Sequence, residues 1–164
     1  SFLIAALDDR ITLSAPCVMV SCHFFGGCRC ESGLPVHVRD THVTNNAEIA
    51  ALFAPKPQLL VSNGDDWTKH TPTLEYPFLR KIYQLYGKEE KVKNIHLPEE
   101  KHDYGKSKRM ALYDFVAEQF KLNRKLADES KVELIDPSTL FVFGKDHLVP
   151  EGLLKPNQKV QFPK

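Results

Sequence analysis

The chain has 164 residues, of which 42% are hydrophobic and 26% charged, a length and composition typical of one globular domain. The formal net charge is +1, so no charge excess favours binding to nucleic acid or to an anionic membrane surface. No apolar run approaches the roughly 20 residues that a membrane-spanning helix needs, so no membrane span is predicted.

The first half of the chain predicts a helix, a strand, a loop and a second helix. Residues 1–10 are typical of a helix, and residues 11–20 predict a buried strand that is interrupted near Pro16, since proline cannot donate to a sheet ladder. A long loop rich in glycine and proline follows. Asn45 or Asn46 then caps a short helix that the turn at residues 54–57 ends.

The second half continues the alternation. Leu59 to Ser62 predicts a strand, and the Asn63-Gly64 pair predicts the turn that ends it. From about residue 73, helical spacing with Gly87 as the stop signal predicts a helix with one apolar face: Phe78, Ile82, Leu85 and Tyr86. Residues 92–97 predict another strand. Ser107 then caps a predicted helix with a second apolar face: Met110, Tyr113, Val116 and Phe120.

This alternation predicts an α/β fold with a mostly parallel sheet and helices on both faces. The alternation of predicted helices and strands ends after Asn123. We therefore expect a domain over residues 1–123 and a C-terminal extension over 124–164 that packs on it. The extension offers two short strand-like runs, at 132–135 and 140–143.

The candidate chemistry lies where the two later strands end. Ligand sites in open α/β sheets lie beyond the carboxyl ends of the strands, so the residues that follow them are expected to share one cleft: Asp65, Asp66, His70, His102 and Asp103. An imidazole that takes a proton from a nucleophile needs a carboxylate on its other nitrogen. His102 is the predicted base and Asp66 its acid, with Asp65 as the alternate.

Simpler interpretations of these residues stay open at this stage. His102 lies in a highly charged turn, where an exposed histidine is ordinary, and Asn-Gly-Asp-Asp is good turn chemistry in any loop. Trp67 is either a stacking platform for a sugar or aromatic substrate or a side chain that packs under its own loop, and packing is the commoner role.

Four cysteines lie in the first quarter of the chain, Cys17, Cys22, Cys28 and Cys30, without the paired spacing of a zinc site. A metal site between the thiols at 28 and 30 and the nearby histidines, His23, His37 and His42, has no recognised spacing either. No metal and no cofactor is predicted.

Several segments together resemble one enzyme family: residues 2–11, 26–31 and 48–55, Asp66-Trp67-Thr68, and His102-Asp103-Tyr104. Over residues 1–123 the chain resembles α/β-hydrolases of the acetylxylan-esterase and dienelactone-hydrolase-like group. The resemblance implies Asp66 as triad acid, His102 as general base, no cofactor, and a catalytic serine upstream of Ser1, which is itself not the nucleophile. It also favours a periplasmic or secreted location, although the compartment stays open.

We therefore expect the C-terminal half of a serine carboxylic-ester hydrolase that acts on a small-molecule or polysaccharide ester. The serine would lie on a G-x-S-x-G turn, and no such turn occurs in these residues, so the piece is expected to be inactive alone. Alternatives are a peptidase or dienelactone-type hydrolase on the same fold, or a non-catalytic or metal-binding α/β module that uses the loop between Cys22 and His42. The acyl group, the alcohol and the oligomeric state are left open.

Overall fold

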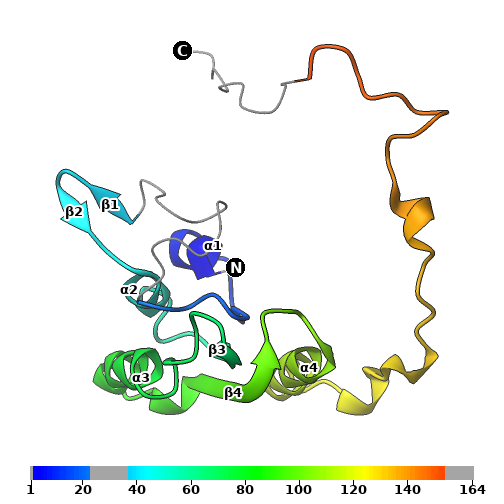
Figure 1. Ribbon diagram of the computed structural model, residues 1–164. Helices are drawn as coiled ribbons and strands as arrows, with labels where there is room; N and C mark the ends of the chain where they lie inside the picture. Colours follow the sequence, from blue (N-terminus) through cyan, green and yellow to red (C-terminus); the bar gives the residue numbers. More distant parts are fainter. Residues whose placement is uncertain (1, 23–36, 154–164) are drawn as a thin grey trace. The chain divides into compact units, whose positions relative to one another are not determined.

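The computed structural model describes residues 2–22 and 37–153, and the chain divides into two units, Ser1–Ala127 and Asp128–Lys164. Helices and strands alternate along the first unit (Figure 1). In chain order its elements are α1 (Phe2–Leu7), β1 (Val38–Arg39), β2 (His42–Val43), α2 (Asn46–Ala51), β3 (Gln58–Asp65), α3 (Glu75–Leu85), the 3-10 turn η1 (Glu89–Lys91), β4 (Val92–Lys101), α4 (Lys106–Phe120) and the 3-10 turn η2 (Arg124–Leu126).

A parallel pair of strands, β3 and β4, forms the centre of the first unit, in register from Gln58 opposite Val92. Residues 11–20 also pair with β3, but only through isolated parallel bridges at Ser14 and Cys17. The strand predicted over residues 11–20, interrupted near Pro16, is therefore present only as these two bridges, which lie on either side of Pro16. Pro16 has no N–H to donate, and Val18 has a φ of 50°, which turns the chain out of an extended path.

Helices cover both faces of this parallel pair, as the α/β prediction requires. Leu60 of β3 packs into an apolar cluster with residues of α1, α2 and α3. Its neighbours Leu59 and Val61 point the other way and pack against Phe115 of α4. The β3–β4 pair therefore lies between α4 and the other three helices (Figure 1).

The N-terminal cap of α2 is confirmed at Asn45, whose Oδ1 accepts hydrogen bonds from the backbone N–H groups of Ala47 and Glu48. The short antiparallel hairpin that β1 and β2 form before it was not predicted.

The buried faces of α3 and α4 differ from the predicted ones. In α3 the buried residues are Glu75, Leu79 and Tyr83, whereas Leu85 is 82% exposed. In α4 they are Lys108 and Phe115, with half of Phe120 exposed, and the residue at the N-cap is Gly105 rather than Ser107. For both helices the more apolar face was predicted to be buried. In the structure each buried face instead includes a polar side chain, Glu75 in α3 and Lys108 in α4, that has hydrogen-bond partners.

The second unit contains two 3-10 turns within its described residues, η3 (Glu129–Lys131) and η4 (Pro137–Leu140). An aspartate side chain caps each of them by accepting a serine N–H. The strands predicted at 132–135 and 140–143 are wrong, because no described strand pairs with either run. Across residues 2–22 and 37–153, no helix is both long and apolar enough to cross a membrane.

Candidate active site

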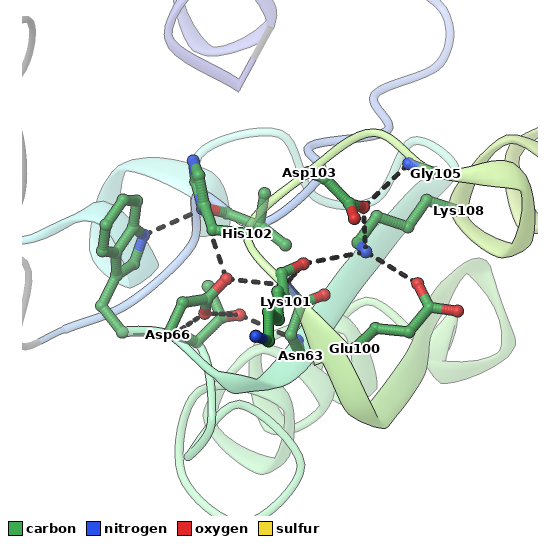
Figure 2. Close-up of polar contacts among 11 residues, drawn as sticks. Asn63, Asp66, Glu100, Lys101, His102, Asp103, Gly105 and Lys108 are labelled. Carbon is green, nitrogen blue, oxygen red and sulfur yellow. Dashed lines mark hydrogen bonds and ion pairs between the residues drawn. The ribbon is translucent and has the colours of Figure 1, made fainter.

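The carboxyl ends of β3 and β4 lie side by side and carry the polar residues of the candidate site (Figure 2). The prediction that β3 ends at Ser62 is wrong, because the ladder continues with Asn63 opposite Leu97 and Asp65 opposite Lys101. The register shifts between these two pairs, so the strands bend at the point where they deliver their functional side chains.

Gly64 lies at this register shift and allows the close approach of the two strands. A Cβ atom at position 64 would lie 1.9 Å from the carbonyl oxygen of Pro98 in β4, far inside contact distance. Only glycine fits here without moving a strand. The chain then leaves the sheet at Asp66, directly beside the end of β4.

Asp66 and His102 lie in contact across the two strand ends. The distance between Asp66 Oδ2 and His102 Nδ1 is 3.3 Å. The Asp66 side chain is 3% exposed and that of His102 is 47% exposed, so the carboxylate is covered while the imidazole faces outward. The second ring nitrogen of His102 points away from Asp66 (Figure 2). This arrangement holds the ring by one nitrogen and leaves the other pointing away from the carboxylate, as a general base requires.

The Asp66 carboxylate is held by two further side chains. Its Oδ1 accepts from the Thr68 backbone N–H at 2.6 Å and from the Thr68 hydroxyl at 2.5 Å. Its Oδ2 accepts from the Asn63 amide at 2.8 Å, in addition to His102. Thr68 Oγ1 in turn accepts the backbone N–H of Asn63. The turn after β3 is thus built around the carboxylate.

The indole ring of Trp67 packs beside the imidazole of His102. Its ring centroid lies 4.4 Å from that of His102, with the rings tilted by 47°. The indole N–H donates to the carbonyl oxygen of Val18 at 3.0 Å, so the polar group of the ring has its hydrogen-bond partner within the protein. Val18 is a buried β-branched residue in the left-handed region, a conformation that costs strain and is often found beside functional sites.

Lys108 holds the loop that carries the imidazole. Its ammonium is fully buried and donates to Glu100 Oε2 and Asp103 Oδ1 at 2.7 Å each, and to the carbonyl oxygen of Lys101 at 3.0 Å (Figure 2). These bonds lower the pKa of the Glu100 and Asp103 carboxyl groups below their ordinary values. His102 thus lies between residues that one buried cation ties together.

The other candidates differ from Asp66 in burial or in partner. Asp65 is exposed at the end of β3, and the aspartate that contacts His102 is Asp66. His70 is exposed in the turns that follow Thr68. The Asp103 carboxylate binds Lys108.

The cysteines that the structure describes do not supply a nucleophile. Burial raises the pKa of the Cys17 and Cys22 thiols to about 11, so little thiolate exists near neutral pH. His37 binds the Asn46 amide oxygen through Nε2. In the described part of the chain no three His, Cys, Asp or Glu residues could hold a metal ion together. The predicted metal-site candidates Cys28, Cys30 and His23 lie outside that part.

Comparison with solved structures finds two esterases. Methylesterase BT1017 matches with a TM-score of 0.79 and 50% identity, over 92% of this chain and 35% of the methylesterase. A carbohydrate esterase family 15 (CE15) glucuronoyl esterase from Caldicellulosiruptor kristjansonii matches with a TM-score of 0.43 and 21% identity, over 58% of this chain and 26% of the esterase. No family model and no curated protein matches the chain.

The chain resembles esterases of the α/β-hydrolase kind. The methylesterase, which matches 92% of this chain at 50% identity, confirms the predicted resemblance at the level of an α/β-hydrolase esterase. The chain spans about a third of that methylesterase's length. The parallel β3–β4 pair with helices on both faces is compatible with the same fold.

Three residues of this candidate site were missed by sequence reasoning: Asn63, Thr68 and Lys108. Asn63 was assigned to a turn, although the two polar residues that follow the apolar run at 59–61 are a signal that the strand continues into a polar site. Thr68 follows an aspartate by two positions, the spacing of a side chain that caps its own turn. Nothing in the sequence indicates that Lys108 is buried, because its partners come together only in the fold.

Proposed function

We propose that this chain supplies the acid and the base of a serine carboxylic-ester hydrolase. His102 is the general base in this proposal and Asp66 the acid that orients it. The observation that carries the proposal is the contact between Asp66 Oδ2 and His102 Nδ1 at the carboxyl ends of two adjacent parallel strands. The esterase resemblance supports it independently.

The chemistry follows from the geometry of the pair. A proton on Nδ1 of neutral His102 points to Asp66, so the lone pair lies on Nε2. Nε2 takes the serine proton as the oxygen attacks the ester carbonyl, and the nearly buried carboxylate stabilises the imidazolium formed. The proton then passes to the leaving alcohol, and an acyl-serine remains. The same nitrogen then takes a proton from water as the water oxygen attacks the acyl-serine, and passes that proton to the departing serine oxygen, so the carboxylic acid is released and the serine is restored.

The nucleophile and the oxyanion donors of this mechanism are proposed to come from residues outside these 164. The G-x-S-x-G motif does not occur in them, and they span 35% of the length of the related methylesterase. By this route the chain alone hydrolyses no ester. The complete site forms only in a polypeptide that also contains the serine.

The substrate class that we favour is a carboxylic ester of a carbohydrate. The name of the 50% identical relative favours a methyl ester, in which the sugar acid is the acyl group and methanol leaves. An acetyl ester, in which acetate is the acyl group and the sugar leaves, is the second candidate. The two differ in which side of the ester carries the sugar, so they are distinguished by product.

The test uses the natural polypeptide that contains this chain. Methanol release from a sugar-acid methyl ester and p-nitrophenol release from p-nitrophenyl acetate are measured for the wild type and for His102→Ala. We expect a fall in kcat of at least about 10³-fold in His102→Ala on whichever ester is turned over. His70→Ala, an exposed histidine in the neighbouring turns, is the matched control and stays near wild type. Unchanged turnover in His102→Ala would overturn the proposal.

A further inference from the structure

Asn63 is buried near the end of β3, and its side-chain amide contacts the acid Asp66 and the backbone of the residue that precedes the base (Figure 2). Nδ2 donates to Asp66 Oδ2 at 2.8 Å and to the carbonyl oxygen of Lys101 at 2.5 Å. Lys101 is the last residue of β4 and directly precedes His102. One amide group therefore joins the acid to the segment that carries the base.

The orientation of this amide follows from its neighbours. Both atoms that Nδ2 faces are hydrogen-bond acceptors, and a reversed amide would place Oδ1 against them with no proton between. Oδ1 itself is buried and has no hydrogen-bond partner among the residues that the structure describes. Asn63 thus acts as a double donor at this position, which no apolar side chain of similar size can replace.

The hydrogen bonds of Asp66 show what the double donor does. A carboxylate offers about four acceptor positions. Here they receive the Thr68 N–H, the Thr68 hydroxyl, the Asn63 amide and the His102 imidazole. Asn63 is the group that holds Oδ2, the oxygen that faces the imidazole. Without it, the half-exposed His102 ring is the one remaining partner of Oδ2 among the residues that the structure describes.

We infer that Asn63 is a positioning residue of the proposed hydrolase, which sets the Asp66 carboxylate and the backbone before His102 at the separation that their hydrogen bond needs. The inference rests on the proposed function. Asn63 has no exposed surface and so contacts no substrate. Its loss therefore acts on turnover through the base, and substrate binding is unaffected.

Asn63→Leu removes both donors at similar volume, and the chain offers a matched control. The amide of Asn94 in β4 also donates twice across the β3–β4 pair, to the Leu60 carbonyl oxygen at 3.0 Å and to Ser62 Oγ at 3.1 Å, but it does not touch the acid or the base. Asn94→Leu therefore removes a comparable pair of bonds without disturbing Asp66. Both variants are made in the natural polypeptide, and kcat, KM and the melting temperature are measured.

We expect kcat of Asn63→Leu to fall roughly 10- to 100-fold while KM stays within about threefold, because a small displacement of the base slows the chemical step. Asn94→Leu should lower the melting temperature by a similar amount and keep kcat within about threefold of wild type. If Asn63→Leu does not fold, the smaller Asn63→Ala is measured in its place, with Asn94→Ala as control and the same expectation.

Equal kcat losses in the Asn63 and Asn94 variants, or a loss seen mainly in KM, would overturn the inference and leave Asn63 a residue of stability alone. Failure of the proposed function looks different. In that case the His102→Ala polypeptide keeps its turnover, whatever the Asn63 variants do.

Discussion

Replacement of Asp66 by asparagine tests the site at the level of folding as well as catalysis. The substitution keeps the shape and exchanges one carboxylate oxygen for an NH₂ group. If the NH₂ takes the place of Oδ2, it faces the donors of Asn63 and His102. If it takes the place of Oδ1, it faces the two donors of Thr68. Either way two donors lose their acceptor.

The cost in stability can be estimated from these contacts. Each hydrogen bond to a charged group contributes about 1.5–3 kcal/mol, and the half-exposed His102 recovers part of its loss from water. We therefore expect Asp66→Asn to lower the free energy of unfolding by about 2–3 kcal/mol, which is a fall in melting temperature of roughly 5–10 °C for a chain of this size. Circular dichroism of the 164-residue chain measures it.

Asp65→Asn is the matched control, because Asp65 is the exposed neighbour in sequence. Its free energy of unfolding should change by less than about 0.5 kcal/mol. In the natural polypeptide, Asp66→Asn should also lower kcat by about 10⁴-fold, as expected when the acid no longer holds the imidazole. Equal melting temperatures for the two variants would refute this reasoning, and a larger loss in Asp65→Asn would move the acid by one residue.

Two further predictions concern the frame around the pair. Gly64→Ala should destabilise the chain by about 2–3 kcal/mol in chemical unfolding, because the added methyl group meets the Pro98 carbonyl; Gly144→Ala, where a Cβ meets nothing within 4 Å, should have little effect, and equal effects would contradict the close approach. Lys108→Met should be less stable than wild type at pH 7, with the difference shrinking as the pH falls below the ordinary pKa values of the two carboxyl groups. The sign follows because the lowered pKa values of Glu100 and Asp103 add stability above their ordinary values of 4.5 and 3.8, and that stability is lost as the pH falls through the lowered ones. A difference independent of pH would refute the role of the two carboxylates.

The sequence was informative where local chemistry decides the structure. The short runs at 59–62 and 92–97 predicted two neighbouring strands because such runs next to helical segments are typical of a parallel sheet, and both strands exist. The Asn45 cap was predictable because it depends on local contacts. Its side chain accepts hydrogen bonds from the N–H groups two and three residues further along the chain. The proximity of Asp66 to His102 follows once both strands are placed.

Features that depend on contacts between distant segments could not be read in advance. Periodicity gives α3 more than one possible buried face, and the one that packs contains Glu75, which accepts the backbone N–H of Cys22 from far along the chain. Lys108 is buried for a similar reason, because two carboxylates and a carbonyl oxygen surround it. The extension of β3 past Asn63 depends on the Gly64 approach to Pro98, which only the paired strands reveal.

The most direct test of the central claim is the position of the proton on the neutral His102 ring, measured by ¹⁵N NMR of the 164-residue chain and assigned with His102→Gln. A proton on Nδ1, with that preference lost in Asp66→Asn, is the predicted result. A neutral ring protonated on Nε2, or a spectrum that Asp66→Asn leaves unchanged, would contradict the account.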